Sequence, residues 1–254
     1  MSSFTDSVVV VTGAGSGIGR TTALEFADRG ANVVVADVDS GGGRDTVEAI
    51  GDAGGEASFV ETDVTDPAAV QEMVDVAVAE YGRLDCAFNN AGIGSEQIPV
   101  SEYPAEQWEH IIDVNLLGVF NCMKAELARM KQQDTSDAIV NNSSVLGKVG
   151  FEKSSAYTAA KHGVLGLTKS AALENGEAGV RINSVCPAFI DTPLLEKGNV
   201  VNDPETLEEL KGLHAMNRLG TPAEVAQAVV WLCSDEASFI TGEALGVEGG
   251  YLSR

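Results

Sequence analysis

Positive charge is the scarcest property of this 254-residue sequence. It has 16 lysines and arginines against 38 aspartates and glutamates, which gives a net charge of −22 at pH 7 and a pI near 4.3. A field of this sign repels phosphate backbones and anionic lipids, so we expect neither nucleic acid nor a membrane as a partner. The acids are scattered rather than collected in one tail, which indicates a solvated surface on all sides. Adaptation to a saline cytoplasm and ordinary drift toward an acidic surface both explain this composition.

Metal-ligand clusters and long apolar runs are also missing. The four cysteines and three histidines are far apart and no C-x-x-C pattern occurs, so we expect free buried thiols and no metal. No apolar run approaches the roughly 20 residues of a membrane span. The polar start MSSFTDS predicts no signal peptide. These absences favour a cytoplasmic protein.

The sequence does contain a regular alternation of short apolar runs and helical patterns. This alternation predicts a single domain over residues 1–254, with a Rossmann-type α/β fold: a doubly wound sheet of seven parallel strands with helices on both faces. Residues 191–217 form an insertion after the sixth strand, which we interpret as a substrate lid. The glycines at 41–43 and 54–55 are interpreted as loop residues. The strands are expected at 8–12, 31–37, 56–61, 84–88, 138–142, 180–186 and 243–248.

A glycine-rich turn, TGAGSGIG at 12–19, directly follows the first strand and precedes a helical pattern. Gly13, Gly17 and Gly19 allow a tight turn, close approach to a pyrophosphate and close packing of the helix on the sheet. A phosphate would then lie at a helix N-terminus, where free N–H groups favour anions. In this strand–turn–helix context the turn predicts a dinucleotide site rather than a mere flexible loop.

Asp37 ends the second strand, twenty residues after Gly17. A carboxylate at this place accepts hydrogen bonds from ribose hydroxyls and repels a 2′-phosphate. No lysine or arginine stands beside it, so we expect NAD(H) rather than NADP(H). The alternative is an aspartate that only stabilises a turn.

Tyr157 and Lys161 are four residues apart in a helical pattern, so both side chains lie on one helix face. Tyrosine has a pKa of about 10 and is a poor base unless a nearby positive charge stabilises its phenolate. Ser144 ends a strand-like run thirteen residues earlier, where its hydroxyl could donate to a substrate oxygen. Taken alone, the Tyr–Lys pattern is better explained by a surface pair on an amphipathic helix.

Together with N-N-A-G at 89–92 and Asn115, these motifs resemble those of the short-chain dehydrogenase/reductase family, from Val8 to about Gly250. The resemblance implies hydride transfer between a nicotinamide and a secondary alcohol or ketone. It implies that Tyr157 is the general acid/base and that Lys161 lowers the tyrosine pKa and binds the nicotinamide ribose. Ser144 would orient the substrate oxygen.

Asn115 would, by the same resemblance, distort its helix and hold a water of the proton relay; a core amide without a catalytic role is the alternative. Relatives usually have glycine where this chain has Ala188, which puts the backbone flexibility of that segment in question. The full set of implied cofactor contacts is Gly13, Ser16, Gly17, Ile18, Gly19, Asp37, Asp63, Val64, Asn90, Ala91, Gly92, Tyr157, Lys161, Ile190 and Thr192.

The substrate is left open between a sugar, a cyclic alcohol and a hydroxyacyl compound. The family commonly forms dimers or tetramers, and we expect a homotetramer. The apolar stretches at 164–167 and 244–247 that would form its interfaces would also suit a monomer core. A non-catalytic NAD-binding sensor or scaffold is the rival function, because a fold does not determine a function. The expected pocket wall is Ser95, Leu146, Phe151, Phe189, Leu194 and His214.

The acidic composition leads to a prediction about salt. The Debye length falls from about 30 Å at 0.01 M to about 3 Å at 1 M, so molar KCl should remove most of the repulsion between surface acids. We expect the melting temperature to rise as KCl is increased from about 0.1 to about 3 M, and a matched sucrose series controls for solute exclusion. A flat melting temperature would rule out adaptation to a saline cytoplasm.

Overall fold

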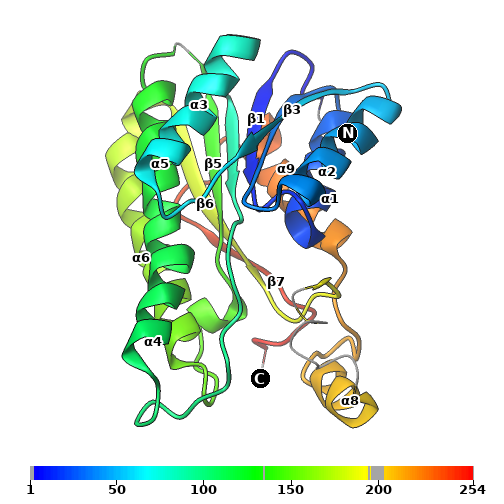
Figure 1. Cartoon of the computed structure of the whole chain (residues 1–254), viewed down its shortest axis with the longest axis vertical. Helices are drawn as coiled ribbons and strands as arrows, with labels where there is room; N and C mark the ends of the chain where they lie inside the picture. Colours follow the sequence, from blue (N-terminus) through cyan, green and yellow to red (C-terminus); the bar gives the residue numbers. More distant parts are fainter. Residues whose placement is uncertain (1–2, 134, 194, 196–202, 254) are drawn as a thin grey trace.

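A seven-stranded parallel sheet forms the centre of the computed structural model, in the order β3-β2-β1-β4-β5-β6-β7 (Figure 1). The structure describes residues 3–133, 135–193, 195 and 203–253. All six neighbouring pairs of strands are parallel, which confirms the predicted sheet. The strands are β1 Val8–Thr12, β2 Asn32–Asp37, β3 Glu56–Glu61, β4 Cys86–Asn89, β5 Asp137–Asn142, β6 Val180–Pro187 and β7 Ala244–Val247.

Helices cover both faces of this sheet (Figure 1). One face carries α1 Gly17–Asp28, α2 Ser40–Asp52 and α9 Pro222–Cys233. The other carries α3 Pro67–Tyr81, α4 Ala105–Ile112, α5 Gly118–Met130 and α6 Ser155–Asn175. The short α8, Pro204–Gly212, lies beyond the sheet and within the predicted lid. Among the described residues, no helix combines the length and apolarity needed to cross a bilayer.

The central strand β1 shows why the sheet is buried on both faces. Its valines alternate: Val8 and Val10 pack with residues of α3, α5 and α6, whereas Val9 and Val11 pack with residues of α1 and α9. All four are fully buried. Because side chains alternate along a strand, a continuous apolar run is the pattern of a strand covered on both sides.

The direction of the chain connections reverses at β1, which lies between β2 and β4. In open parallel sheets this reversal leaves a crevice at the carboxyl ends of the strands. The glycine-rich turn after β1, Asp37 at the end of β2 and the Asn89–Asn90 pair at the end of β4 all meet there. The fold therefore collects the predicted motifs at one edge.

The interpretation of residues 41–43 as a loop is wrong. They form the first turn of α2, whose N-terminus is capped by Asp39: its side chain accepts a hydrogen bond from the Gly41 N–H. A Cβ on Gly43 would lie 2.1 Å from the Phe59 ring, and one on Gly42 would lie 2.9 Å from the Gly15 carbonyl oxygen. Glycine is used here because the helix packs tightly on β3 and on the glycine-rich turn.

This packing predicts opposite effects for two glycines of α2. Gly43→Ala should lower the free energy of unfolding by about 1–3 kcal/mol, because the Phe59 ring must move from beneath the Arg44 guanidinium. Gly51→Ala, in the same helix, meets no atom within 4 Å and should raise stability by up to about 1 kcal/mol. Urea unfolding measures both. A Gly43→Ala chain as stable as the unmodified protein would contradict the packing argument.

Candidate active site

A cleft of about 650 Å³ opens at the carboxyl ends of β1, β2 and β4. Most of the predicted site residues line it: Gly13, Ser16, Gly17, Ile18, Asp37, Asp63, Val64, Asn90, Ala91, Gly92, Asn115, Tyr157, Lys161 and Thr192. Three predicted site residues do not line this cleft: Gly19, Ser144 and Ile190. The lining also includes residues that the sequence analysis did not single out: Val38, Thr62, Ile93, His110, Val114, Asn142 and Pro193.

The glycine-rich turn leaves the N-terminus of α1 open toward the cleft. Gly17 has φ +53°, and a Cβ there would lie 3.6 Å from Thr192 across the cleft. Gly19 packs directly against the backbone of Gly13, since a Cβ added at this position would lie 2.1 Å from the Gly13 carbonyl oxygen. Ser16 precedes the helix and makes no side-chain cap. The free N–H groups at this end suit a phosphate, so the turn fits a dinucleotide.

Asp37 is fixed against this turn by two backbone bonds. Its Oδ2 accepts a hydrogen bond from the Gly15 N–H at 2.7 Å, and its Oδ1 accepts one from the Asp39 N–H at 2.9 Å. Each carboxylate oxygen keeps a second lone pair that can accept a hydroxyl. The residue therefore stabilises a turn and also presents a fixed negative charge to the cleft.

The N-N-A-G segment is joined to β1 through Thr12, a residue that the sequence analysis missed. The backbone N–H groups of Asn90 and Ala91 both donate to Thr12 Oγ1 at 3.0 Å. The Asn90 side chain donates to the carbonyl oxygens of Thr12 and Gly13, at 3.0 and 3.1 Å. These bonds hold the end of β4 against the glycine-rich turn.

Asn115 lies in a π-helical turn, Asp113–Leu117, between α4 and α5. This turn interrupts the helical stretch 105–130 at the asparagine. Its side chain accepts from the Ile93 N–H and donates to the carbonyls of Ile93 and Ile111, each at 3.1 Å. The oxygen and the nitrogen of this buried amide therefore both have hydrogen-bond partners, and those on Ile93 connect this helix to the segment after β4.

Tyr157 and Lys161 lie side by side on α6. The Lys161 Nζ is 5.5 Å from the centroid of the tyrosine ring. It donates to the carbonyl oxygen of Asn142, at the end of β5, at 2.7 Å. Asn142 also donates through its side chain to Asn90 Oδ1 at 2.9 Å. The only sequence signal for Asn142 was an Asn–Asn pair that ends an apolar strand.

Burial sets the proton affinities of this pair. It raises the pKa of Tyr157 to about 12, and a hydrogen bond from Ser144 lowers that pKa only in part. Burial also lowers the pKa of Lys161 to about 8, against a small opposing effect of Cys186. Burial of the phenol thus opposes the lowering of the Tyr157 pKa by Lys161 that the family resemblance implies, and that lowering stays a prediction. At neutral pH the phenol holds its proton.

Ser144 begins the loop after β5 and lies between two backbone segments. Its Oγ accepts from the Leu146 N–H at 3.1 Å and donates to the Pro187 carbonyl oxygen at 3.5 Å. The segment after Pro187 continues without strain at Ala188, which is absent from the residues with positive φ. Thr192 faces the cleft, while Ile190 pairs with Gly220.

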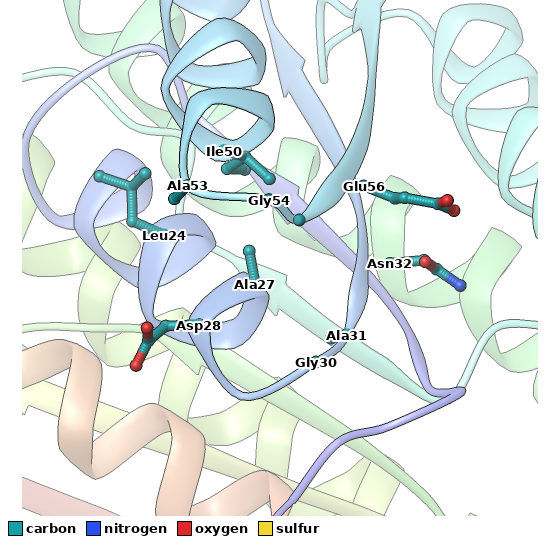
Figure 2. A pocket seen from close by; sticks show the side chains of 11 residues that line it. Leu24, Ala27, Asp28, Gly30, Ala31, Asn32, Ile50, Ala53, Gly54 and Glu56 are labelled. Carbon is teal, nitrogen blue, oxygen red and sulfur yellow. The ribbon is translucent and has the colours of Figure 1, made fainter.

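A second cavity, of about 330 Å³, lies at the opposite ends of β2 and β3 (Figure 2). Ala27 of α1 and Ile50 of α2 face one another across it, with Asp28 and Glu56 at its margins. It contains none of the predicted catalytic or cofactor residues. Within the described part of the chain, no group of three or more His, Cys, Asp or Glu side chains is arranged to bind a metal ion.

Comparison with known proteins agrees with this geometry. A family model described as "Enoyl-(Acyl carrier protein) reductase" matches residues 13–252. The chain is 44% identical to cyclohexanol dehydrogenase of Acinetobacter sp. strain SE19 over 251 residues, which cover 99% of this chain and 97% of the relative. The chain belongs to the short-chain dehydrogenase/reductase family. Members of this family are oxidoreductases that use a nicotinamide cofactor.

Two solved structures of this family superimpose closely on the chain. The crystal structure of levodione reductase has a TM-score of 0.95 at 37% identity, covering 98% of this chain and 99% of its own. Carveol dehydrogenase from Mycobacterium avium, in complex with NAD, also has a TM-score of 0.95, at 27% identity and full coverage of both chains. The short-chain dehydrogenase fold is therefore preserved over essentially the whole length.

Proposed function

We propose that the protein is an NAD(H)-dependent dehydrogenase/reductase for cyclic secondary alcohols and their ketones. The observation that supports this proposal most directly is that Tyr157 and Lys161 both line the cleft, where the nearby Ser144 hydroxyl lowers the Tyr157 pKa. A bound nicotinamide supplies the hydride acceptor or donor, with a positive charge in its oxidised form.

Each side chain of the site has a separate role in the reaction. Tyr157 gives a proton to the carbonyl oxygen during reduction and removes one from the alcohol during oxidation. Ser144 orients that oxygen through its hydroxyl. Lys161, charged below a pKa of about 8, supports the phenolate electrostatically. Asn115 supports the proton relay from within its π-helical turn.

The preference for NAD(H) rests on Asp37. Its carboxylate is fixed at the end of β2 by Gly15 and Asp39, where it would accept the adenosine ribose hydroxyls and repel a 2′-phosphate. The NAD complex of the related carveol dehydrogenase is consistent with this choice. Glycines 13 and 17, Asp63, Val64 and the segment 90–92 are the proposed further contacts.

The proposed preference for a ring-shaped substrate rests on an aromatic cluster around Phe189, which is not part of the lining of the cleft but follows Pro187, whose carbonyl accepts a hydrogen bond from Ser144. Phe189, two residues after Pro187, lies 6.2 Å from Phe151, 6.0 Å from His214 and 6.1 Å from Tyr251, measured between ring centroids. Apolar ring faces suit a cyclic hydrocarbon better than a sugar, which needs several fixed polar partners. The relatives named for cyclohexanol and levodione support the same class. Leu194 of the predicted wall lies outside the described residues.

We further propose a single catalytic domain over 1–254, a lid at 191–217, a homotetramer and a saline cytoplasm as its environment. The described part of the lid includes α8, whose N-terminus is capped by Asp203; residues 194 and 196–202 lie outside the description. Four ion pairs are found among the described residues, so most surface acids have no basic partner. Light scattering in molar KCl tests the tetramer: a mass near 26.4 kDa would refute it.

Replacing the proton donor tests the mechanism. Tyr157→Phe should bind NADH normally but lower kcat by roughly 100-fold or more, because no other group replaces the phenolic proton. Oxidation of cyclohexanol, followed by NADH absorbance, measures turnover, and Tyr103→Phe, outside the cleft, is the control. Near-normal kcat in Tyr157→Phe would exclude this mechanism. NADH binding by the unmodified protein with no turnover of any alcohol would favour a sensor.

Replacing the cofactor carboxylate tests specificity. Asp37→Asn keeps one side-chain oxygen as an acceptor but removes the charge, so it should raise kcat/KM with NADP(H) several-fold. Asp37→Ala should also weaken NAD(H), because the bonds to Gly15 and Asp39 are lost as well. Asp45→Ala, on the exposed face of α2, is the matched control. Equal efficiency of the unmodified protein with both cofactors would show this assignment to be wrong.

A further inference from the structure

Beneath the cleft, four polar side chains form a buried cluster inside the otherwise apolar layer between the sheet and α5 and α6. The Asn89 amide on β4 donates to Glu126 Oε2 of α5 at 3.0 Å and to Asn141 Oδ1 of β5 at 3.1 Å. The Asn141 amide donates to Thr168 Oγ1 of α6 at 2.9 Å. All four residues are at most 1% exposed. The proposed mechanism uses none of them.

Two oxygens in this cluster have no hydrogen-bond partner: Glu126 Oε1 and Asn89 Oδ1. They belong to the two side chains that the Asn89–Glu126 bond already joins. A single proton held between them would satisfy both. If Oε1 carries it, the carboxylic acid donates to Asn89 Oδ1 while Oε2 accepts from the Asn89 amide, and the two groups form a two-bonded ring. An ionised carboxylate would instead leave a buried charge and two unpaired acceptors.

The surroundings of Glu126 also favour the protonated acid. Burial raises the pKa of its carboxyl to about 7, and only the Asn89 bond lowers it. No charged group of α3, β4, β5 or α6 contributes to this shift. The Cys122 thiol, on the same helix, has its own pKa raised by burial and by Glu126. On α6, the ammonium of Lys161 is bonded to the Asn142 carbonyl.

The cluster lies directly behind the cofactor and lysine sites. Asn89 precedes Asn90, which binds the carbonyls of Thr12 and Gly13 in the glycine-rich turn. Asn141 precedes Asn142, whose carbonyl accepts the Lys161 ammonium. Asn89 and Asn141 are the buried neighbours of Asn90 and Asn142. Because Glu126 is bonded to Asn89, and through Asn89 to Asn141, the positions of Asn90 and Asn142 depend on it.

We propose that Glu126 is a protonated positioning residue, whose Oε1–H donates to Asn89 Oδ1 and fixes the ends of β4 and β5 that bind the nicotinamide cofactor and Lys161. Loss of this proton leaves two facing acceptors and loosens both strand ends. The proposal rests on the proposed function only in taking the cleft to bind NADH.

Glu126→Gln is the central variant, because its amide donates and accepts in the same places as the neutral acid but does not titrate. Asp137→Asn is the matched control. Asp137 is also buried, with a pKa raised to about 6 by burial, but it begins β5 at the opposite end of the strand. It is bonded to Thr135 and Gln133, away from the cleft.

The first test is infrared difference spectroscopy of the unmodified protein against Glu126→Gln in deuterated buffer. At pH 6 we expect a protonated carboxyl C=O band that the variant lacks and Asp137→Asn keeps. Absence of that band would overturn the proposal. So would a Glu126→Gln chain that fails to fold at pH 6, since the variant reproduces the hydrogen bonds of the acid.

The second test follows stability with pH at constant KCl. The folded pKa of Glu126 lies above its unfolded value near 4.5, so ionisation opposes folding. Below about pH 4.5 the difference in unfolding free energy between the unmodified protein and Glu126→Gln should not change with pH. Between about pH 4.5 and 7 the unfolding constant of the unmodified protein should rise by up to about tenfold per pH unit relative to the variant, and then level off. A ratio independent of pH would contradict the proposal.

The third test measures NADH affinity by fluorescence titration, which requires no turnover. The ratio of Kd in the unmodified protein to Kd in Glu126→Gln should increase several-fold from pH 6 to 8.5. Titration of Lys161 occurs in both proteins and cancels in this ratio. Asp137→Asn should keep the pH dependence of the unmodified protein. A constant ratio would leave Glu126 without a positioning role, whereas NADH binding to none of these proteins would refute the proposed function instead.

Discussion

Side-chain amides tie together the ends of three parallel strands, and the cleft depends on these ties. A parallel sheet pairs its strands along their length, but the loops that leave its carboxyl end need other partners for their backbone groups. Thr12 and Asn90 join β1 to β4, and Asn142 joins β5 to Asn90. The carbonyl oxygen of Asn142 also accepts a hydrogen bond from the Lys161 ammonium. One continuous set of bonds thus positions the glycine-rich turn, the N-N-A-G segment and the lysine.

The strands and the cleft could be predicted from the sequence because both follow from local patterns. Apolar runs predict buried strands, and the motifs that follow three of them must meet at one edge. Helix α2 was missed because its glycine-rich start has poor intrinsic helix propensity and depends on contacts with Phe59 and Gly15 that are distant in sequence. The elevated Tyr157 pKa was missed for a related reason: spacing reveals a neighbouring ammonium but not the burial that opposes it.

Charge is distributed very differently on the surface and in the interior. The exterior has a large excess of acids with few ion pairs, while each acid in the interior has its own hydrogen-bond partners. Asp85 accepts from the Val8 N–H and pairs with Arg83, Asp137 is bonded to Thr135 and Gln133, and Glu126 meets Asn89. Salt therefore acts on the outer shell, whereas inside the protein burial raises the pKa of the Glu126 and Asp137 carboxyls.

The bonds of Asn115 have a consequence for the shape of the cleft. Its amide accepts from the Ile93 N–H and donates to the Ile93 carbonyl, which joins the segment after β4 to the helix pair α4–α5. The Asn90 side chain joins the start of the same segment to the glycine-rich turn. A dinucleotide in the cleft would therefore lie between two walls that are joined to each other, with Thr192 on the side that faces Gly17.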